Sequence, residues 1–479
     1  MPRLRATLIL LAVYLLWAGT VSAQTTQPVD RVFVLQAGGA WIEFQPKDAS
    51  FVPVNLPVFG LAFDRTGSGK YTGEWVPVAR PTTQPATQPT TRPADVGSLP
   101  PPVIVKPPGI HVASGESITA ALKAAGSGTV VYLAAGGVYN EGVTDTSLRL
   151  RSVTLAAWGN GAKPLVKVPN GSALVLYRPT DVTVTGIEFA SDKPTAAGIR
   201  IFGGERVKLD GINVHDFVFG VTCEPYATNR ASQFTLTRSE VWGNYSPKNK
   251  GDSSGVFVSG TDGVEITNNY IHDNGWREGE SAGTDRNHNL YAVADVTGFV
   301  LKDNVIARGA SWNAQVRCGG EVEGNTFVDA PAHLSFGYVN GAGPIAIGGV
   351  SGKVNNNTFI GERLMAGQHR GTALVFGNCK PGAVECVGNI FANDNPPNPN
   401  RGVNQAAIRT DIGILSDDNP HRGKDVRVTD LVIKDNKGVW PGGIFKNNVA
   451  RFNPINVQKT FEPVDVQQVR AAALAKVGG

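Results

Sequence analysis

The feature that most constrains the fold of this chain is a short β-type unit that recurs along residues 186–391. The segments GIEF, GINV, RSEV, NNYI, DNVI, GNTF, NNTF and GNIF align with steps of 21 to 35 residues. Each unit carries strand-type runs such as VTVTGIEF and GVEITNNYI, without a helical pattern. Such a repeat is typical of a solenoid whose coils each contain three short strands. One coil cannot bury its own apolar face, so stacked coils must supply the core.

An asparagine recurs at one place in five of these units. The chain also contains 57 Gly and 31 Pro residues, which suits turn-rich β structure. We expect these asparagines to lie near a turn, where their amides stack from coil to coil and satisfy backbone groups. They are Asn269, Asn304, Asn325, Asn357 and Asn389.

The N-terminus has the layout of an export leader. Arg3 and Arg5 form a positive segment, residues 8–17 are apolar, and residues 21–23 read VSA, which suits cleavage. Residues 1–23 are therefore predicted to be a signal peptide. A membrane anchor fits less well, because the apolar run is short and no positive flank follows it. We expect a secreted, periplasmic or envelope protein with no transmembrane segment after cleavage.

Four further parts follow the leader. Residues 24–80 alternate apolar and polar side chains in short runs, which predicts a small β domain. Residues 81–108 form a linker rich in Pro, Thr and Gln that is too polar to pack. The solenoid is expected over residues 109–450 and begins with a short helix capped by Ser117. Residues 451–479 are predicted to be a tail whose helix covers the open end of the solenoid.

The charge balance of the chain gives no reason to expect a nucleic-acid partner. The formal net charge is +4 and falls to about +2 without the leader, whose two charged residues are arginines. A near-neutral protein has no broad positive field for a polyanion. No metal-binding spacing such as CxxC or HExxH occurs. We expect no cofactor. Calcium is the one ion left open, but segments such as DSSG and TDGV are short and lack a dense run of acids, so no clear calcium site is evident.

The four cysteines allow two interpretations in an oxidising compartment. Cys379 and Cys386 flank the segment KPGAVE and either form a disulfide across one turn or stay reduced. Cys223 and Cys318 are expected to be buried free thiols.

In a regular solenoid, chemistry is expected where coils depart from the regular step. Two long insertions, NYSPKNKGDSSG at residues 244–255 and DNGWREGESAGTDRN at residues 273–287, lead directly into the strands GVFV and HNLY. Both insertions should leave the solenoid along the same edge. Two long neighbouring loops on one edge predict the wall of a cleft.

Strand alternation selects the side chains that would face this cleft. If Leu290 and Ala292 point into the core, Asn289 and Tyr291 point outward. The same alternation in the next two coils places further side chains outward: Asn313, Gln315, Arg317, His333 and Ser335. Because adjacent coils stand ~4.8 Å apart, Tyr291, Arg317 and His333 are predicted to form one column. His288 is expected beside it.

The chain resembles a known fold family. A helix that runs into the strand of GGVYNEG looks like the entry to a right-handed parallel β-helix of the pectin-lyase-like type. The segment NHNLY, followed one coil later by an arginine-bearing strand, is similar to a pattern in exported bacterial β-helix proteins. The resemblance covers residues 109–450 and implies an all-β fold. Proteins of this fold include polysaccharide lyases, hydrolases, epimerases, phage tailspikes and surface binders, so it implies a polysaccharide partner without fixing the activity.

The predicted catalytic group of Tyr291, Arg317, His333 and His288 suits β-elimination on a uronic acid. Arginine pairs with the carboxylate and makes the neighbouring C–H bond more acidic. His or Tyr removes that proton, and Tyr can protonate the leaving oxygen. Other side chains are predicted to bind the polysaccharide: Asn289, Asn313, Gln315, Trp242, Trp276, Trp312, Glu280 and Asp285.

Two alternatives remain open at this point. A hydrolase would use the loop carboxylates Glu280 and Asp285 at a separation typical of glycosidases. A non-catalytic envelope or matrix scaffold would instead pack His288 and Tyr291 against the loop and leave Arg317 in a surface ion pair. The sequence predicts no particular oligomeric state.

Overall fold

In the computed structural model the chain divides into two units, Met1–Ile104 and Val105–Gly479. The structure describes residues 106–249, 251–337, 349–363, 371–395, 406–410, 431–443, 445–447, 458 and 460–478, together with three strands of the first unit. Those strands are β1 (Val32–Leu35), β2 (Trp41–Pro46) and β3 (Trp75–Pro77). They form an antiparallel sheet in the order β1-β2-β3. All three strands lie within residues 24–80, where the sequence predicts a small β domain. The expected signal peptide, and the linker up to residue 105, lie outside the described residues.

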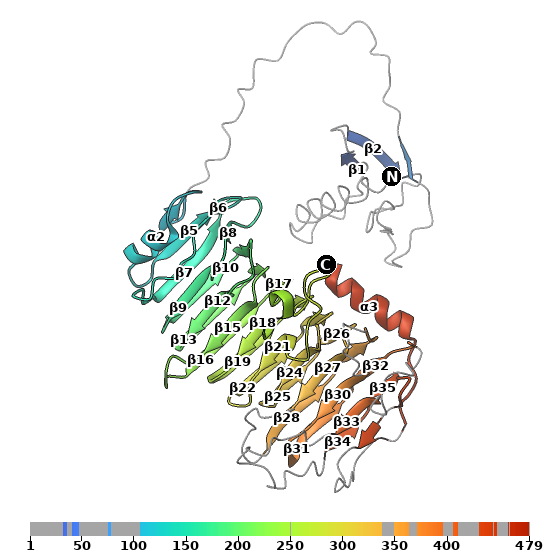
Figure 1. The fold of residues 1–479 in the computed structure, drawn as a ribbon. Coiled ribbons are helices and arrows are strands. Elements are labelled where there is room, and N and C mark those ends of the chain that lie inside the picture. Colours follow the sequence, from blue (N-terminus) through green and yellow to red (C-terminus); the bar gives the residue numbers. More distant parts are fainter. Residues whose placement is uncertain are drawn as a thin grey trace, which may run out of the picture. The chain divides into compact units, whose positions relative to one another are not determined.

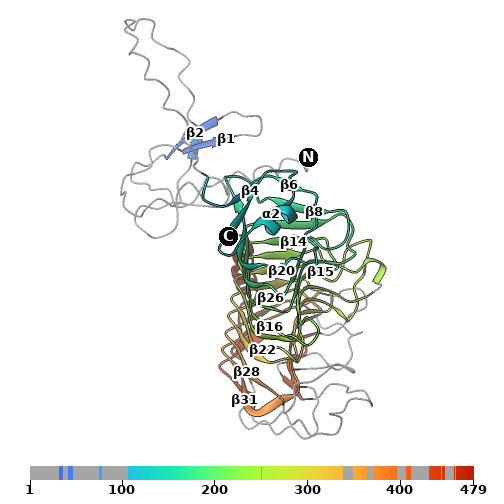
Figure 2. The same ribbon diagram turned by 90° about the vertical axis from the view of Figure 1, so that its left-hand side faces the viewer.

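The second unit is a right-handed parallel β-helix, as the sequence predicts (Figure 1). Within the described residues its strands form three parallel sheets of 12, 11 and 10 strands, which we call the first, second and third sheets. From β7 onward, each coil adds one strand to each sheet in turn, and Figure 2 shows the coils stacked along the solenoid. Within each sheet, strands of successive coils pair in parallel, so a residue can be placed by its column as well as by its strand.

The first sheet holds the strands that open each coil. They are β4 (Ile110–Val112), β5 (Val130–Ala134), β7 (Arg151–Trp158), β10 (Thr180–Thr185), β13 (Gly204–Asp210), β16 (Ala231–Thr237), β19 (Thr261–Thr267), β22 (Thr297–Lys302), β25 (Gly320–Glu323), β28 (Val350–Asn355), β31 (Cys379–Val387) and β34 (Val432–Lys434).

The second sheet holds short strands that follow the first turn of each coil. They are β6 (Val138–Tyr139), β8 (Leu165–Val168), β11 (Glu188–Ser191), β14 (Asn213–His215), β17 (Glu240–Trp242), β20 (Tyr270–His272), β23 (Val305–Ala307), β26 (Thr326–Val328), β29 (Thr358–Ile360), β32 (Ile390–Ala392) and β35 (Lys437–Val439).

The third sheet completes each coil. Its strands are β9 (Leu174–Tyr177), β12 (Ala197–Phe202), β15 (Phe219–Glu224), β18 (Ser253–Val258), β21 (Asn287–Ala292), β24 (Trp312–Val316), β27 (Ala332–Phe336), β30 (Thr372–Phe376), β33 (Ala406–Thr410) and β36 (Phe445–Asn447).

A short helix, α2 (Ile118–Ala124), lies at the start of the solenoid. As expected, Ser117 caps it: its side chain accepts a hydrogen bond from the backbone N–H of Ala120 at 3.1 Å. Ile118, Ala121 and Leu122 are its buried residues. The helix thus places its apolar face on the first coil, whose core would otherwise be open.

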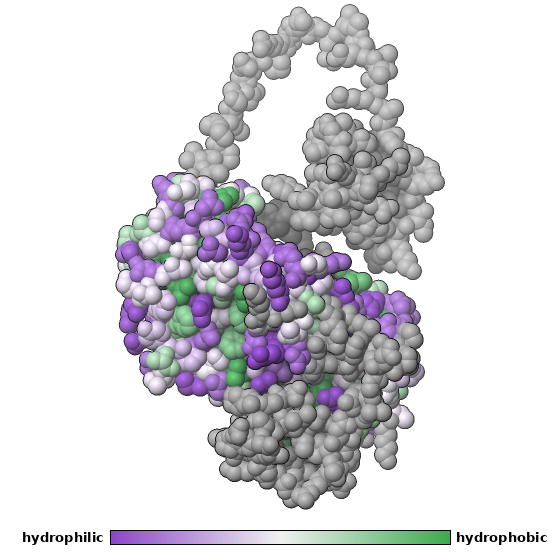
Figure 3. Space-filling model, viewed as in Figure 1, coloured by the Kyte–Doolittle hydropathy of each residue, from purple (hydrophilic) through white to green (hydrophobic). Residues whose placement is uncertain are grey.

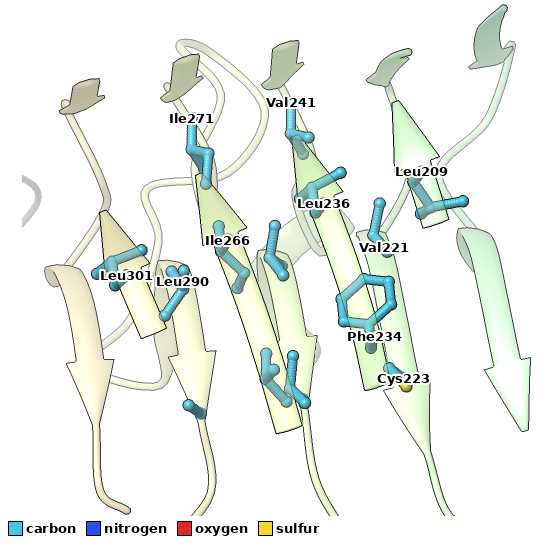
Figure 4. Close-up of a cluster of buried hydrophobic side chains, with 14 of the residues drawn as sticks. Leu209, Val221, Cys223, Phe234, Leu236, Val241, Ile266, Ile271, Leu290 and Leu301 are labelled. Carbon is cyan, nitrogen blue, oxygen red and sulfur yellow. The ribbon is translucent and has the colours of Figure 1, made fainter. Parts of the chain in front are cut away.

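The core runs through the centre of the coils and is built from alternate residues of all three sheets. Figure 4 shows side chains such as Val221, Phe234, Ile266 and Leu290 directed at one another across the interior. Outward positions are mixed, and Figure 3 shows hydrophilic and hydrophobic residues side by side on the solenoid face that it views. Inward apolar residues of successive coils stack in register, so each coil buries the face that its neighbour leaves open.

The recurring asparagines form a ladder at the corner between the first and second sheets. Oδ1 of Asn325 accepts hydrogen bonds from the backbone N–H and Nδ2 of Asn304, at 3.0 and 2.9 Å. The same pair of bonds joins Asn325 to Asn357, and the ladder extends from Asn269 to Asn436. The expectation that these residues satisfy backbone groups at a turn is confirmed.

The C-terminal tail ends the solenoid in a way that differs from the prediction. Gln458 continues the ladder by accepting from the backbone N–H of Asn436 at 2.8 Å, and Phe461 stacks on Phe391 at 5.5 Å. The expected helix is present as α3 (Val466–Gly478), but it packs against β29 and β32 of the second sheet. Arg470 anchors it to Asp329 at 2.8 Å. The helix therefore covers a side of the solenoid.

All four cysteines are free, so the disulfide interpretation of Cys379 and Cys386 is wrong. Both residues lie on β31 with their side chains in the core, at 1% and 0% exposure, and burial raises the pKa of each thiol. Cys223 is buried as expected, whereas Cys318 is partly exposed and packs against the edge of the core. Inward-facing thiols of one strand cannot bridge a surface turn.

Candidate functional site

A cleft with a volume of about 620 Å³ lies on the outer face of the third sheet, over strands β12 to β24. Its floor contains five outward residues in register on successive strands. The pairing runs from Arg200 to Thr222, then Phe257, Tyr291 and Gln315. This row places one side chain of each coil in the cleft, spaced by ~4.8 Å along the solenoid.

The two long insertions form one wall of this cleft, as the sequence predicts. Asp252 from the first insertion and Asp285 and Arg286 from the second line the cleft. Nε of Arg286 lies 3.1 Å from Oδ1 of Asp252, so an ion pair joins the two loops. Asn287 also donates to the backbone carbonyl of Gly251 at 3.1 Å. The wall is therefore held by contacts between the insertions.

Tyr291 lies at the centre of the cleft. Its ring makes edge contacts with Phe257 at 5.4 Å and with His288 at 5.5 Å between centroids. The guanidinium of Arg317 lies 4.8 Å from its ring centroid. Burial raises the pKa of the Tyr291 phenol, and the positive charge of Arg317 opposes this effect without cancelling it. The phenol is therefore protonated at neutral pH and is a proton donor.

The structure brings His288, Tyr291 and Arg317 together in the cleft, along with the predicted ligand-binding residues Gln315, Trp312 and Asp285. His288 and Trp312 are each 2% exposed and are paired in register on β21 and β24. Arg317 directly follows β24, and its backbone N–H donates to the carbonyl of Ala292 at 2.9 Å. These six residues are the part of the predicted site that the structure assembles.

His333 does not belong to this group, which corrects the predicted column. Tyr291 is in register with Gln315 and Ser335, whereas His333 lies at the corner of the coil and is 1% exposed. Its Nε2 is 2.8 Å from the carbonyl oxygen of Gly361 and its Nδ1 is 3.1 Å from Nδ2 of Asn313. Burial lowers the pKa of His333 to about 4. This imidazole does not reach the cleft.

Asn289 and Asn313 are also misplaced by the sequence prediction. Both are fully buried and form a second ladder at the corner between the second and third sheets. Asn289 accepts from Nδ2 of Asn274 at 2.9 Å and donates to Oδ1 of Asn313 at 2.9 Å. Strand alternation breaks at this corner, because the side chain after the outward His288 turns along the ladder. Neither asparagine can bind a ligand in the cleft.

Trp276 and Glu280 lie in the second insertion but do not line the cleft. Nε1 of Trp276 donates to the carbonyl of Arg308 at 2.9 Å, and the guanidinium of Arg363 lies over its ring at 4.8 Å. Glu280 accepts a hydrogen bond from the hydroxyl of Tyr245. Burial, followed by this bond, raises the pKa of Tyr245 to about 12. Both predicted ligand-binding residues instead hold the insertion in place.

Trp242 lies on the outer face of the second sheet, away from the cleft lining. Its indole stacks on His215 at 4.3 Å between ring centroids. Nδ1 of His215 is 2.7 Å from Asp216, and Nε2 is 3.1 Å from Glu188 of the preceding coil. Burial lowers the pKa of His215, but these two carboxylates outweigh burial and the pKa is raised.

The same arrangement recurs on the other face of the Trp242 indole. His272 stacks there at 6.1 Å, with Nδ1 2.7 Å from Asp273 and Nε2 3.2 Å from Glu240. Arg308 binds Asp273 with two hydrogen bonds of 2.8 and 2.5 Å. Burial opposes the pKa rise of His272, and the carboxylates prevail. We call the set of Trp242, the two histidines and their carboxylates the histidine–tryptophan stack.

Sequence reasoning missed the half of the cleft that comes from earlier coils. Arg200, Thr222 and Glu224 line the cleft, and Nη2 of Arg200 is 3.3 Å from Oε2 of Glu224. The signal was present in the segments AGIRIF and FGVTCE, which align with NHNLYA in the third sheet. Their outward residues share the row of Tyr291, but no long insertion draws attention to these coils.

Two polar atoms of the cleft floor have no hydrogen-bond partner within the described part of the chain. They are Oγ1 of Thr222, which is 3% exposed as a residue, and Oε1 of Gln315, which is 4% exposed. Nε of Arg200 is in the same situation. A shielded polar atom without a partner costs about 1–3 kcal/mol, and native proteins rarely leave one. Three in one row leave hydrogen bonds that only a group from outside the described chain, such as water or a ligand, can make.

Among the described residues, no group of three or more His, Cys, Asp and Glu side chains is arranged to hold a metal ion. No helix among them is long and apolar enough to span a membrane. The titratable groups that line the cleft are those of arginines, carboxylates, one histidine and one tyrosine.

Comparisons with known proteins give a likeness of fold. No family model and no curated protein matches the chain. An alginate lyase from Paenibacillus is 15% identical with a TM-score of 0.35, covering 71% of this chain and 99% of its own. A pectate lyase is 14% identical with a TM-score of 0.37, and the match covers 60% of this chain and 78% of the lyase. The tailspike protein of E. coli bacteriophage HK620, solved with a pentasaccharide, is 15% identical with a TM-score of 0.42. The match covers 70% of this chain and 60% of the tailspike chain.

Proposed function

We propose that the protein is an exported carbohydrate-active β-helix that binds an acidic polysaccharide in the third-sheet cleft and cleaves it by β-elimination. The observation that carries this proposal is the meeting of His288, Tyr291 and Arg317 in one cleft of about 620 Å³. An arginine, an imidazole and a phenol can supply the three functions that the reaction needs, which are neutralisation of the carboxylate, a base and an acid. The leader-like N-terminus supports export.

Each group has a defined role in the proposed reaction. Arg317 pairs with the uronate carboxylate and stabilises the negative charge that develops on it. His288 takes the proton from the carbon next to that carboxylate. The electron pair of that C–H bond forms the new double bond, and the bond to the glycosidic oxygen breaks. Tyr291, which is protonated because burial raises its pKa, gives its proton to the leaving oxygen.

The rest of the cleft floor suits a sugar chain. Phe257 and Tyr291 supply ring surfaces, and Gln315 offers an unpartnered carbonyl oxygen to a hydroxyl. The row runs across successive coils, so a bound chain would lie along the solenoid axis.

The hydrolase alternative has weaker support. Its two carboxylates, Glu280 and Asp285, are not brought together, because only Asp285 lines the cleft. Asp252 and Glu224 also line it, but each lies in an ion pair with an arginine, Arg286 and Arg200 respectively. A non-catalytic binding protein would use the same cleft without product release.

The test is an assay of the full-length purified protein against polygalacturonate, alginate and hyaluronan, read by the ultraviolet absorbance of the new unsaturated uronate. We expect a rise with at least one polymer and a loss of two to three orders of magnitude in Arg317→Ala. Arg230→Ala is the matched control, because Arg230 is an exposed arginine that pairs with Asp262 outside the cleft. Reducing ends without absorbance would show hydrolysis, and no product at all would show a binding or scaffold protein.

A further inference from the structure

We propose that the part of the cleft formed by β12, β15 and β18 is a separate binding subsite that recognises the hydroxyls of a sugar unit remote from the reacting one. It is centred on Arg200 and Thr222. The consequence is that the protein prefers long chains to the shortest oligosaccharides. This inference rests on the proposed binding of a sugar chain in the cleft, and its test separates the two.

The register places this subsite well away from the reactive group. Arg200 and Tyr291 occupy the same outward row on strands separated by three coil-to-coil steps. At ~4.8 Å per step, the two side chains originate ~14 Å apart along the solenoid. A single sugar ring that contacts Tyr291 cannot also contact Arg200, so occupation of both requires a chain.

Arg200 is held in place before any ligand arrives. Nη2 of its guanidinium is 3.3 Å from Oε2 of Glu224, and the guanidinium carbon lies 4.5 Å from the ring centroid of Phe202. A side chain fixed by two partners loses little further freedom on binding. Because the charge of Arg200 is balanced by Glu224, this subsite has no excess positive charge. It therefore suits sugar hydroxyls better than a second carboxylate.

Thr222 is the residue that most directly indicates a ligand here. It is 3% exposed, lies between Arg200 and Phe257 in the row, and its Oγ1 has no partner within the described residues. Nε of Arg200 beside it is in the same situation. Rotation of the threonine about χ1 to another staggered position moves the hydroxyl to the place that the methyl group now occupies. A sugar hydroxyl could then accept from or donate to it.

Aromatic surface completes the subsite. The rings of Phe219 and Phe257 meet edge to face with centroids 5.9 Å apart, and both line the cleft. Apolar faces of sugar rings pack on such surfaces while their hydroxyls reach the polar residues beside them. No histidine or tyrosine lies among the lining residues of β12, β15 and β18. The subsite therefore binds and positions the chain and takes no part in proton transfer.

The experiment compares the wild type with Thr222→Val on uronate oligosaccharides from di- to octasaccharide, measured both by cleavage rates and by isothermal titration. Valine keeps the shape of threonine and removes its hydroxyl. We expect KM and Kd for the long chains to rise about three- to tenfold, the loss of one hydrogen bond, with kcat unchanged. The shortest cleaved oligosaccharide should show no difference. Thr235→Val, an outward threonine on β16 of the first sheet, is the matched control.

The outcomes distinguish this inference from the proposed function. If the wild type cleaves and Thr222→Val behaves like it at every chain length, the subsite is refuted and the proposed function stands. If the variant binds short and long chains more weakly by the same factor, or if only its kcat falls, Thr222 is not a remote binding residue. If the wild type binds long chains without cleaving and the variant weakens that binding, the subsite stands and β-elimination falls. No binding of any oligosaccharide refutes both.

Discussion

The outer faces of the second and third sheets are built from the same coils but differ in how their polar groups are paired. On the second sheet, the two histidines of the histidine–tryptophan stack each bind two carboxylates. On the third sheet, the row through Tyr291 leaves Oγ1 of Thr222 and Oε1 of Gln315 without partners in the described chain. One face satisfies its polar groups within the chain, and the other is, in our proposal, completed by a ligand. The difference shows where to look for function in a solenoid whose core is uniform.

The position of the long insertions explains why the two faces differ. Both insertions lead into the third sheet, at β18 and β21, and there they wall a cleft. The second sheet instead follows a tight corner filled by the asparagine ladder, and α3 covers its later strands. The histidines of the second-sheet face are largely buried, with side chains 15% and 11% exposed, so they gain by pairing with the carboxylates beside them.

The largest expected effect comes from the centre of the cleft. In Tyr291→Phe, the donor to the leaving oxygen is lost, and kcat should fall by roughly two to four orders of magnitude. The melting temperature should change little, because the aromatic contacts of the ring remain. Steady-state rates and thermal unfolding of the same samples check both statements. Tyr226→Phe is the control, since Tyr226 is an exposed tyrosine outside the cleft lining.

The opposite pattern is expected for the second-sheet face. Asp273→Asn removes a carboxylate that binds both His272 and Arg308. The free energy of unfolding should fall by about 1–3 kcal/mol, the value of hydrogen bonds to charged groups, while cleavage is unchanged. Denaturant unfolding and the cleavage assay would show this. A loss of activity at full stability would contradict the assignment of this face to structure.

The pH dependence of stability should also come from the second-sheet face. The pKa values of His215 and His272 are raised in the folded protein, so the folded state holds these protons more tightly than the unfolded chain. Their contribution is complete below the unfolded histidine pKa and is lost as pH rises through the raised folded values. Melting temperatures should therefore fall from mildly acidic to alkaline pH, and His215→Gln/His272→Gln should flatten this slope.

The carboxylates of the histidine–tryptophan stack set the lowest pH at which the stack stabilises the folded protein. The pKa of Asp273 is lowered to about 2 and that of Asp216 is also lowered, because the hydrogen-bonded partners outweigh burial. Their contribution is present above the unfolded carboxyl pKa and is lost as pH falls through the lowered values. If the melting temperature changes with pH in the same way in the double histidine variant and in the wild type, the pH dependence does not come from the second-sheet face.

The smallest expected effect is on the stability of Thr222→Val. Because Oγ1 of Thr222 has no partner in the described chain, its removal should leave the free energy of unfolding unchanged or raise it by up to about 1 kcal/mol. The same variant should weaken binding of long sugar chains. A clear loss of stability in denaturant unfolding would show that the hydroxyl has a structural partner.

The fold could be predicted from the sequence because its signals are local and repeated. The apolar alternation recurs from coil to coil, the asparagines at the first corner recur in successive coils from Asn269 onward, and the structure pairs both in register. The orientation of Tyr291 and Gln315 followed from Leu290 and Ala314, which are buried in the core. Repetition supports such an inference, because the same pattern of apolar and polar residues can be compared between successive coils.

The site could be predicted only in part, because corners do not follow strand alternation. Asn289, Asn313 and His333 occupy equivalent corner positions, and all three turn into the second ladder. Trp242 was placed at the cleft because it lies next to an insertion, but its strand belongs to the second sheet. Arg200 and Thr222 were missed since their coils carry no insertion. Which residues share a row depends on register, and register is set by tertiary contacts.

The most direct test of the central claim is a crystal structure of Tyr291→Phe soaked with uronate tetra- and hexasaccharides. The account predicts a sugar chain along the third-sheet row, with a carboxylate on Arg317 and hydroxyls within hydrogen-bond distance of Gln315 and, for the longer chain, Thr222. A sugar bound against Trp242 on the second sheet, or a cleft that stays empty at saturating concentration, would contradict it.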